Sequence, residues 1–271
     1  MLLNLGIRAH DLAFNDLAGL IDQLHAYQLT HIQFAAAKCF PQNGPLTQVA
    51  AKHYHDTFAQ AHIAITIQGC YVPLGAKDLA KRQAGIARFI HEAAFTKALG
   101  ATVIATECGG DGNTPENFTQ AAYERVRDSF TQILTALPAT VPVAIEAGLH
   151  SPIYSAAVLR RLLDDLAAPN VCALVDGANL MTPDNWQRMP TVLAEALDLL
   201  APDIAALHLK DARVVNGAVQ IVASGHGVID YTPWLTYIKQ VRPQLPVSLE
   251  ATKTPDITAA VAALQAKYAE L

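Results

Sequence analysis

Short apolar runs alternate with amphipathic stretches along the whole chain. Eight of these runs have the length of a strand and are rich in Val, Ile and Leu, as expected for parallel strands buried on both faces. They are LLNLGI (2–7), HIQF (31–34), AITIQ (64–68), TVIATE (102–107), VPVAIEAG (141–148), VCALVDG (171–177), IAALHLK (204–210) and PVSLEAT (246–252). The stretches between them can each hold a helix, so the pattern predicts repeated strand–helix units.

The stretches between the runs carry helical signals. Residues 17–24 place Leu and Ile at the i, i+3, i+4, i+7 spacing, and residues 77–99 are followed by Gly100, a suitable C-cap. Thr-Pro pairs suit a helix start, because Thr can cap the helix and Pro fits its first position. Such pairs begin at Thr114, Thr182, Thr232 and Thr254.

Eight strands and seven or eight helices in 271 residues predict an α/β protein, a single (β/α)8 TIM barrel over residues 1–271. The alternative is an open, doubly wound sheet. It is less favoured because no GxGxxG turn follows the first strand. No Pro-, Gly- or Ser-rich linker divides the chain, so a second domain is not expected.

Composition narrows the class of protein. A hydrophobic content of 52% with only 16% charged residues is typical of a compact globular chain. The net charge of −5 argues against nucleic-acid binding, which normally needs a basic stripe. We expect no membrane span and no signal peptide, since the apolar runs are short and Arg8 and Asp11 interrupt the start. Four cysteines without a CxxC pair indicate free thiols and a cytoplasmic protein, and the oligomeric state, including a homo-oligomer, stays open.

Five of the later apolar runs end in a polar side chain, about one strand–helix unit apart: Glu107, Glu146, Asp176, His208 and Glu250. A barrel would bring these side chains together at its carboxyl-terminal face. Any one of them alone could be structural. Three carboxylates and an imidazole from the last four strands together indicate a site for one divalent metal ion, Mn²⁺, Mg²⁺, Co²⁺ or Zn²⁺. Without a cation, burying those carboxylates would be costly, because like charges disfavour one another's ionisation.

Several short motifs resemble those of the xylose isomerase-like TIM barrel superfamily, which includes sugar isomerases and epimerases, inosose dehydratases and endonuclease IV. The motifs are IEAG (145–148), LVDGANL (174–180), LHLKD (207–211), SGHGVIDY (224–231) and SLE (248–250). The resemblance implies that Glu146, Asp176, His208 and Glu250 bind one divalent metal. It also implies that Glu146 and Glu250 act as an acid/base pair on opposite faces of the substrate.

The remaining candidates concern the substrate. Asn179 stands where many such epimerases have His, His226 stands where the loop glycines usually bracket Glu, and Arg213 is a looser match to a substrate-binding arginine. We expect Lys210 to face inward beside the metal, with Asp211 holding Lys210 or orienting His208. Arg213 would lie on the following loop. The predicted substrate-binding residues are Tyr71, Glu107, Asn179, Lys210, Arg213 and His226.

The predicted function is a metal-dependent isomerase or epimerase of a small sugar, ketose or related polyol carbonyl compound. Glutamate-mediated proton transfer would proceed through an enediolate. The alternative on the same site is dehydration of an inosose. An endonuclease IV-like activity is less favoured, since Phe34 and Gln68 stand where it needs histidines. A non-catalytic sugar-binding barrel is also less favoured, because the set of three acids and one histidine is complete.

Overall fold

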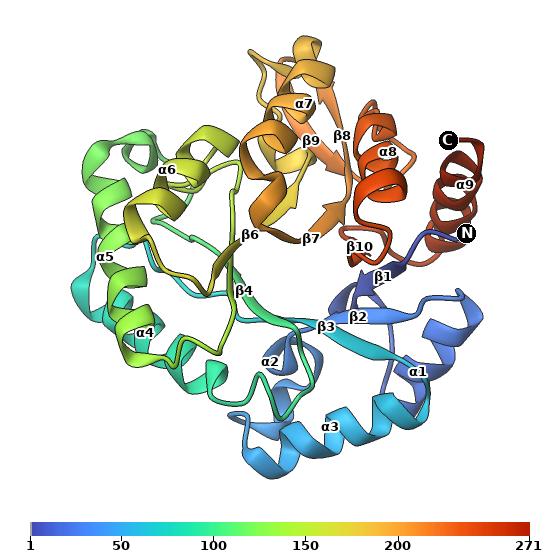
Figure 1. Ribbon diagram of the computed structural model, residues 1–271, viewed down its shortest axis with the longest axis horizontal. Coiled ribbons are helices and arrows are strands. Elements are labelled where there is room, and N and C mark those ends of the chain that lie inside the picture. Colours follow the sequence, from blue (N-terminus) through green and yellow to red (C-terminus); the bar gives the residue numbers. More distant parts are fainter. Residues whose placement is uncertain (1) are drawn as a thin grey trace.

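The computed structural model describes residues 2–271, which form a closed barrel of eight parallel strands surrounded by helices (Figure 1). Strand β1 pairs with both β2 and β10, which closes the ring. The barrel strands are β1 (Leu5–Arg8), β2 (His31–Phe34), β3 (Ala64–Gly69), β4 (Val103–Glu107), β5 (Val143–Glu146), β6 (Val171–Asp176), β7 (Ile204–Leu209) and β10 (Val247–Leu249). Each falls within or overlaps one of the eight apolar runs. The predicted TIM barrel is confirmed, and the open sheet is excluded.

The helices form the outer layer of the barrel (Figure 1). They are α1 (Leu17–Ala26), α2 (Ala36–Cys39), α3 (Gln48–Gln60), α4 (Leu79–Ala93), α5 (Gln120–Ala136), α6 (Ala156–Leu166), α7 (Met189–Leu200), α8 (Thr232–Val241) and α9 (Ile257–Glu270). Pro115 and Pro233 lie in the first turn of a 3-10 helix and of α8, as the Thr-Pro pairs predict, but the expected threonine side-chain caps are wrong. Thr114 precedes only a short 3-10 turn without a side-chain cap, and Thr232 is itself the first residue of α8. Helices α3 and α5 instead begin after Thr47 and Thr119, whose hydroxyls accept a backbone N–H.

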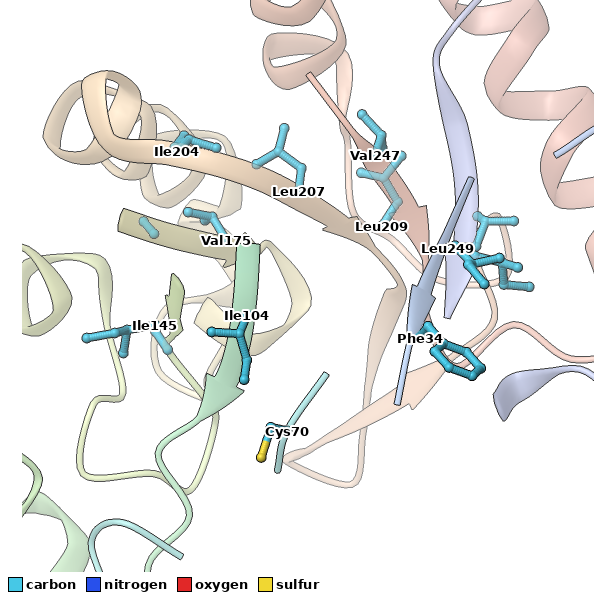
Figure 2. Close-up of a cluster of buried hydrophobic side chains, with 14 of the residues drawn as sticks. Phe34, Cys70, Ile104, Ile145, Val175, Ile204, Leu207, Leu209, Val247 and Leu249 are labelled. Atoms are coloured by element: carbon cyan, nitrogen blue, oxygen red, sulfur yellow. The ribbon is translucent and has the colours of Figure 1, made fainter. Parts of the chain in front are cut away.

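Alternation along each strand separates two sets of side chains. One set packs between strands and helices and includes Ile104, Ile145, Val175, Leu207 and Leu209 (Figure 2). The other fills the inside of the barrel with a small apolar layer: Ile67, Val103, Ala105, Ala144, Leu174 and Ala206. The next inward position on β4, β5, β6 and β7 is therefore the polar residue at the strand end. Strand geometry alone thus aims these side chains at the barrel mouth.

A two-stranded antiparallel hairpin follows β7, and sequence analysis missed it. It consists of β8 (Asp211–Val215) and β9 (Ala218–Val222). Arg213, expected on a loop, lies in β8. The turn is Asn216-Gly217, with φ of 51° and 74°, and Asn-Gly between apolar pairs is a strong hairpin signal.

Within residues 2–271, no helix combines the length and apolar character needed to span a membrane. All four cysteines, Cys39, Cys70, Cys108 and Cys172, are free thiols, as predicted.

We expect Gly6→Ala to destabilise the barrel. Gly6 pairs with both neighbouring strands, and a Cβ there would overlap the backbone carbonyl oxygen and the ring of His31. Overpacking of this kind typically costs about 1–3 kcal/mol of unfolding free energy. Urea denaturation followed by circular dichroism would measure the loss. Gly109→Ala is the matched control, because its Cβ would meet only contacts of 3.5 Å or more. Equal stability of the two variants would contradict this account of β1.

Candidate metal centre

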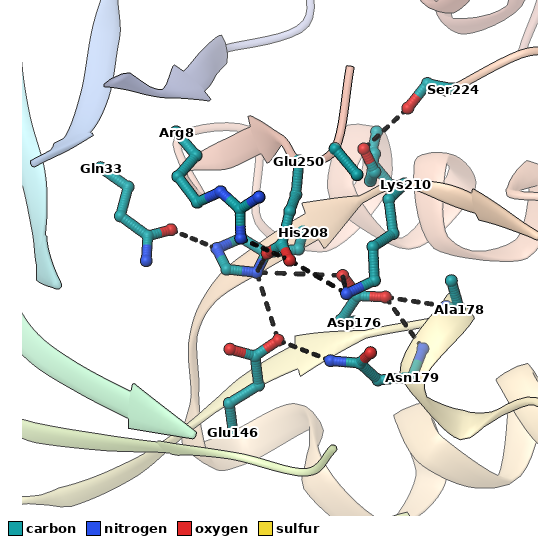
Figure 3. Close-up of polar contacts among 12 residues, drawn as sticks. Arg8, Gln33, Glu146, Asp176, Ala178, Asn179, His208, Lys210, Ser224 and Glu250 are labelled. Atoms are coloured by element: carbon teal, nitrogen blue, oxygen red, sulfur yellow. Dashed lines mark hydrogen bonds and ion pairs between the residues drawn. The ribbon is translucent and has the colours of Figure 1, made fainter. Parts of the chain in front are cut away.

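Four side chains from four neighbouring strands meet at the carboxyl end of the barrel (Figure 3). Glu146, Asp176, His208 and Glu250 each offer one ligand atom, and these atoms lie within 4.8 Å of one another. Their exposed fractions are 2%, 1%, 0% and 7%, so bulk water cannot satisfy them. The predicted convergence is therefore present, and the role of the four as metal ligands stays a prediction.

His208 lies at the centre of the cluster. Its Nδ1 is 2.7 Å from Glu250 Oε2, 3.3 Å from Glu146 Oε1 and 3.9 Å from Asp176 Oδ2. Burial would lower the pKa of His208, but the charges of Glu146 and Glu250 outweigh it and raise the pKa to about 10. The proton on Nδ1 therefore lies among the carboxylates, at the place that would also attract a metal cation.

The opposite nitrogen of His208 is fixed by an amide. Nε2 donates to Gln33 Oε1, and Gln33 Nε2 donates in turn to the Tyr71 hydroxyl at 2.6 Å. These two hydrogen bonds place a hydrogen on Nε2 of His208 and direct its Nδ1 to the carboxylates (Figure 3). Such partners orient the histidine ligands of metal sites.

Two cations hold Glu250. Its Oε1 is 3.0 Å from Lys210 Nζ and 2.8 Å from Arg8 Nη1, and Arg8 also binds Asp11. Burial would raise the pKa of Glu250, but the charges of His208, Lys210 and Arg8 hold it well below its usual range. These cations therefore hold Glu250, the residue after β10, as an anion.

Glu146 and Asp176 have fewer charged partners. Glu146 Oε1 accepts from Asn179 Nδ2 at 2.9 Å, and Asp176 Oδ1 accepts the backbone N–H groups of Ala178 and Asn179. Asp176 Oδ2 is buried, and within residues 2–271 it accepts no hydrogen bond; Lys210 Nζ lies 3.4 Å away. Burial raises the pKa of Asp176 to about 6.

This donor set fits a divalent cation. Metal bonds of about 2.0–2.4 Å place opposite donors at most about 4.8 Å apart, which matches the observed cluster. Three carboxylates and one imidazole suit Mn²⁺, Mg²⁺, Co²⁺ or Zn²⁺. The buried Asp176 oxygen without a hydrogen bond is the kind of atom that a cation would satisfy.

Glu107 adds a fourth carboxyl group beside Glu146, its register partner on the adjacent strand. Gly148 leaves room for it, since a Cβ there would overlap the Glu107 carboxylate. Burial and the charge of Glu146 raise the pKa of Glu107 to about 7. Among the described residues its carboxylate has no hydrogen bond or ion pair, so it is free to bind a ligand.

The structure brings some of the other candidates to the centre and leaves two outside it. Lys210, Asn179 and Tyr71 lie at the centre, where they contact Glu250, Glu146 and Gln33, respectively. Arg213 is exposed on the hairpin, and His226 lies 3.7 Å from Asp256 on the surface.

The expectation for Asp211 was wrong. It neither holds Lys210 nor orients His208, because its carboxylate accepts backbone N–H groups of the loop after the hairpin, at Gly225, Gly227 and Ile229.

Sequence analysis missed Arg8 and Gln33, although both could have been found. Each is the last inward-facing residue of its strand, and counting inward positions from the buried apolar ones identifies it. At the ends of β2 and β3, Phe34 and Gln68 stand where endonuclease IV is expected to have histidines. Phe34 packs outward among helices, and Gln68 Nε2 donates to the Glu92 carbonyl oxygen of α4 at 2.9 Å.

Comparison with known proteins agrees with this architecture. Residues 21–268 match the model of the family described as xylose isomerase-like TIM barrel. The sequence itself has no match among curated proteins.

Three solved structures share the fold. A xylose isomerase domain protein from Planctomyces limnophilus is 18% identical, with a TM-score of 0.73 over 100% of this chain and 99% of that one. The 3-keto-D-glucoside 4-epimerase from E. coli is 14% identical, with a TM-score of 0.75 over 99% and 100%. The IolI protein with a bound zinc atom is 15% identical, with a TM-score of 0.74 over 99% and 96%.

We predict that Gln33→Met weakens metal binding. Without the amide oxygen, nothing fixes the hydrogen on Nε2 of His208, and loss of such a partner typically costs about 10–100-fold in affinity. Titration of the chelator-treated protein with Mn²⁺ or Zn²⁺ would measure it. Gln132→Met, at a half-buried position of α5, is the control. Unchanged affinity in Gln33→Met would show that the amide does not orient His208.

Proposed function

The chain belongs to the xylose isomerase-like TIM barrel family, and on that premise we propose that it is an isomerase or epimerase of a small sugar, ketose or related polyol carbonyl compound. The observation that carries this proposal is a pair of buried glutamates on either side of one histidine. Glu146 lies 3.3 Å and Glu250 2.7 Å from the same nitrogen of His208. In the ring, β6 and β7 separate the strands that carry the two glutamates.

One divalent cation is part of the proposal. Glu146, Asp176, His208 and Glu250 would hold it. When bound, it would polarise a substrate carbonyl and make the neighbouring C–H more acidic.

The side chains would move the proton. A sugar lying between Glu146 and Glu250 presents one face of the acidic carbon to each carboxylate. One glutamate would remove the proton, and the other would return it to the opposite face or to the adjacent carbon. Lys210, buried between Asp176 and Glu250, would stabilise the negative charge that develops on a substrate oxygen.

Glu107 favours a second candidate, dehydration of an inosose or keto acid. The same proton removal, followed by loss of a β-hydroxyl, releases one water and needs an acid to protonate the leaving oxygen. The Glu107 carboxyl, with a pKa near 7 and no partner among the described residues, suits that role. The product distinguishes the two reactions, because only dehydration lowers its mass by one water.

A DNA-directed activity has less support. The endonuclease IV-like reading needs histidines at the ends of β2 and β3, where this chain has Phe34 and Gln68, and a net charge of −5 gives no basic face.

Asp176→Asn should lower metal content. We expect wild-type protein purified without chelator to contain about one equivalent of divalent metal, as a single mononuclear site requires. Elemental analysis would measure it, with the exposed Asp184→Asn as control. If the Asp176 variant retained the full equivalent, the assignment of this ligand would be wrong.

Glu146→Gln and Glu250→Gln should each lose about 10²–10⁴-fold in turnover, because Gln keeps the shape but removes the base. Circular dichroism should show an intact fold, and Glu124→Gln on the surface of α5 should turn over normally. Assays with ketoses and inososes in added Mn²⁺ and D₂O should place deuterium at the isomerised carbon of the wild-type product. An unlabelled product together with active Gln variants would refute the two-glutamate mechanism.

A further inference from the structure

Two loops at the mouth of the barrel are joined to each other beside Glu107. One follows β4 and covers residues 108–119, and the other follows β5 and covers residues 147–155; we call them the β4 loop and the β5 loop. The strands before them end in Glu107 and Glu146, which are register partners. The proton transfer proposed above uses Glu146, but it does not account for the way in which the two loops are joined.

Two buried side chains fasten the β5 loop to the β4 loop. Ser151 Oγ donates a hydrogen bond to the backbone oxygen of Cys108 at 3.0 Å. Asn117 Nδ2 donates to the backbone oxygens of Gly112 and His150, at 2.6 Å each. Ser151 and Asn117 are 3% and 1% exposed, so water does not compete for these hydrogen bonds. The β5 loop is therefore held in one place relative to the end of β4.

Gly148 is the point at which the fastened loop contacts Glu107. The Ser151 N–H donates to the Gly148 oxygen at 3.1 Å, and the Gly148 N–H donates to the Ile153 oxygen at 2.9 Å. A Cβ at Gly148 would overlap the Glu107 carboxylate, and the φ of Gly148 lies outside the left-handed region that favours glycine. Glycine is therefore needed here to make room for a carboxyl group and not for the backbone conformation.

The contact does not supply the Glu107 carboxyl group with a polar partner. Within residues 2–271, no hydrogen bond or ion pair holds this group, and its side chain is only half-buried. Placing an acid against a loop without a partner costs free energy, so stability alone does not explain the arrangement. The charges of Glu146 and Lys210 both act on the pKa of Glu107, in agreement with a position close to the candidate metal centre. A half-buried acid in such a place can bind a ligand in the barrel mouth.

We propose that Ser151 and Asn117 are positioning residues for Glu107. By holding Gly148 against the carboxyl group, they fix it in the barrel mouth, where it forms a hydrogen bond with a substrate hydroxyl group that the cation does not hold. The contact with substrate rests on the proposed function, whereas the positioning of Glu107 does not.

The position of the Glu107 carboxyl group can be followed without turnover, in chelator-treated full-length protein. Carbon-13 NMR of protein labelled at the glutamate Cδ atoms would identify the Glu107 signal by its absence in Glu107→Gln. The signal should move in Gly148→Ala, whose Cβ would displace the carboxyl group directly. It should also move in Ser151→Ala and in Asn117→Asp, because each change removes hydrogen bonds that hold the β5 loop.

Ser155→Ala and Asn170→Asp are the matched controls. Ser155 Oγ accepts from the Val158 N–H at the start of α6 at 3.2 Å, and Asn170 Nδ2 donates to the Val141 oxygen at 2.8 Å. Each control removes the same kind of side-chain hydrogen bond as its test variant, but away from Glu107. Urea denaturation would measure the stability of all the variants. A loss of stability in the controls should leave the Glu107 signal where it is in wild type.

Kinetics would test the contact with substrate, using the ketose or inosose that the wild type converts. A displacement of about 1 Å can cost on the order of 10²-fold in rate, so kcat/KM should fall by up to that factor in Ser151→Ala and in Asn117→Asp. Combining either change with Glu107→Gln should lower kcat/KM no further than Glu107→Gln alone, because all three act through one carboxyl group.

The outcomes separate this inference from the proposed function. An unmoved Glu107 signal in Ser151→Ala and Asn117→Asp, or an equal movement in the controls, would overturn the positioning role even if sugars were isomerised. Losses in kcat/KM that add to the loss in Glu107→Gln would also overturn it, and a fully active Glu107→Gln would overturn the contact with substrate. A signal that moves as expected supports the positioning role even if no sugar is converted.

Discussion

Mutual repulsion among buried carboxylates is the constraint on which this barrel depends. Glu146, Asp176 and Glu250 surround one nitrogen of His208. Carboxyl groups this close together cannot all be ionised unless positive charges compensate for them. Compensation comes from different strands: Arg8 at the end of β1 and Lys210 after β7, with Gln33 of β2 fixing the histidine. These groups meet only if the ring closes between β1 and β10. The charge balance of the site therefore depends on closure of the barrel, since an open sheet would separate Arg8 from Glu250.

Much of the fold and of the site could be predicted from the sequence, because side-chain alternation along each strand decides which residues face the inside of the barrel. In β7, Ala206 lines the inside of the barrel, and Leu207 and Leu209 pack against the helices. His208 must then point inward, and the same argument holds for Glu146 and Asp176. Once the eight runs are taken as barrel strands, topology brings their ends together. Convergence of four residues far apart in sequence thus followed from period and order alone.

Other features of the structure depend on contacts with distant residues, which no local sequence pattern reveals. Asp211 was expected to serve Lys210 or His208, but three backbone N–H groups of the later loop compete for its oxygens and satisfy them. Thr114 and Thr232 look like helix caps, yet the helices begin where packing against the barrel allows. The inward direction of Arg8 can be read from the alternation of β1, but its partner Glu250 is set by the register of β1 with β10.

Acidic side chains lie on one side of the barrel mouth and basic ones on the other. This separation affects how a substrate can be oriented there. Acids follow one another from β4 to β6 and recur after β10. Arg8 and Gln33 instead lie at the ends of β1 and β2, and Tyr71 follows β3, with Lys38 above the tyrosine ring. A cation belongs with the acids, and electron-rich oxygens of a bound sugar belong beside that cation. Any negatively charged substituent is repelled from Glu107 and Glu146 and attracted toward Lys38. The same asymmetry that would gather a metal on one side would therefore favour one orientation of a bound substrate, with its carbonyl end between the two glutamates.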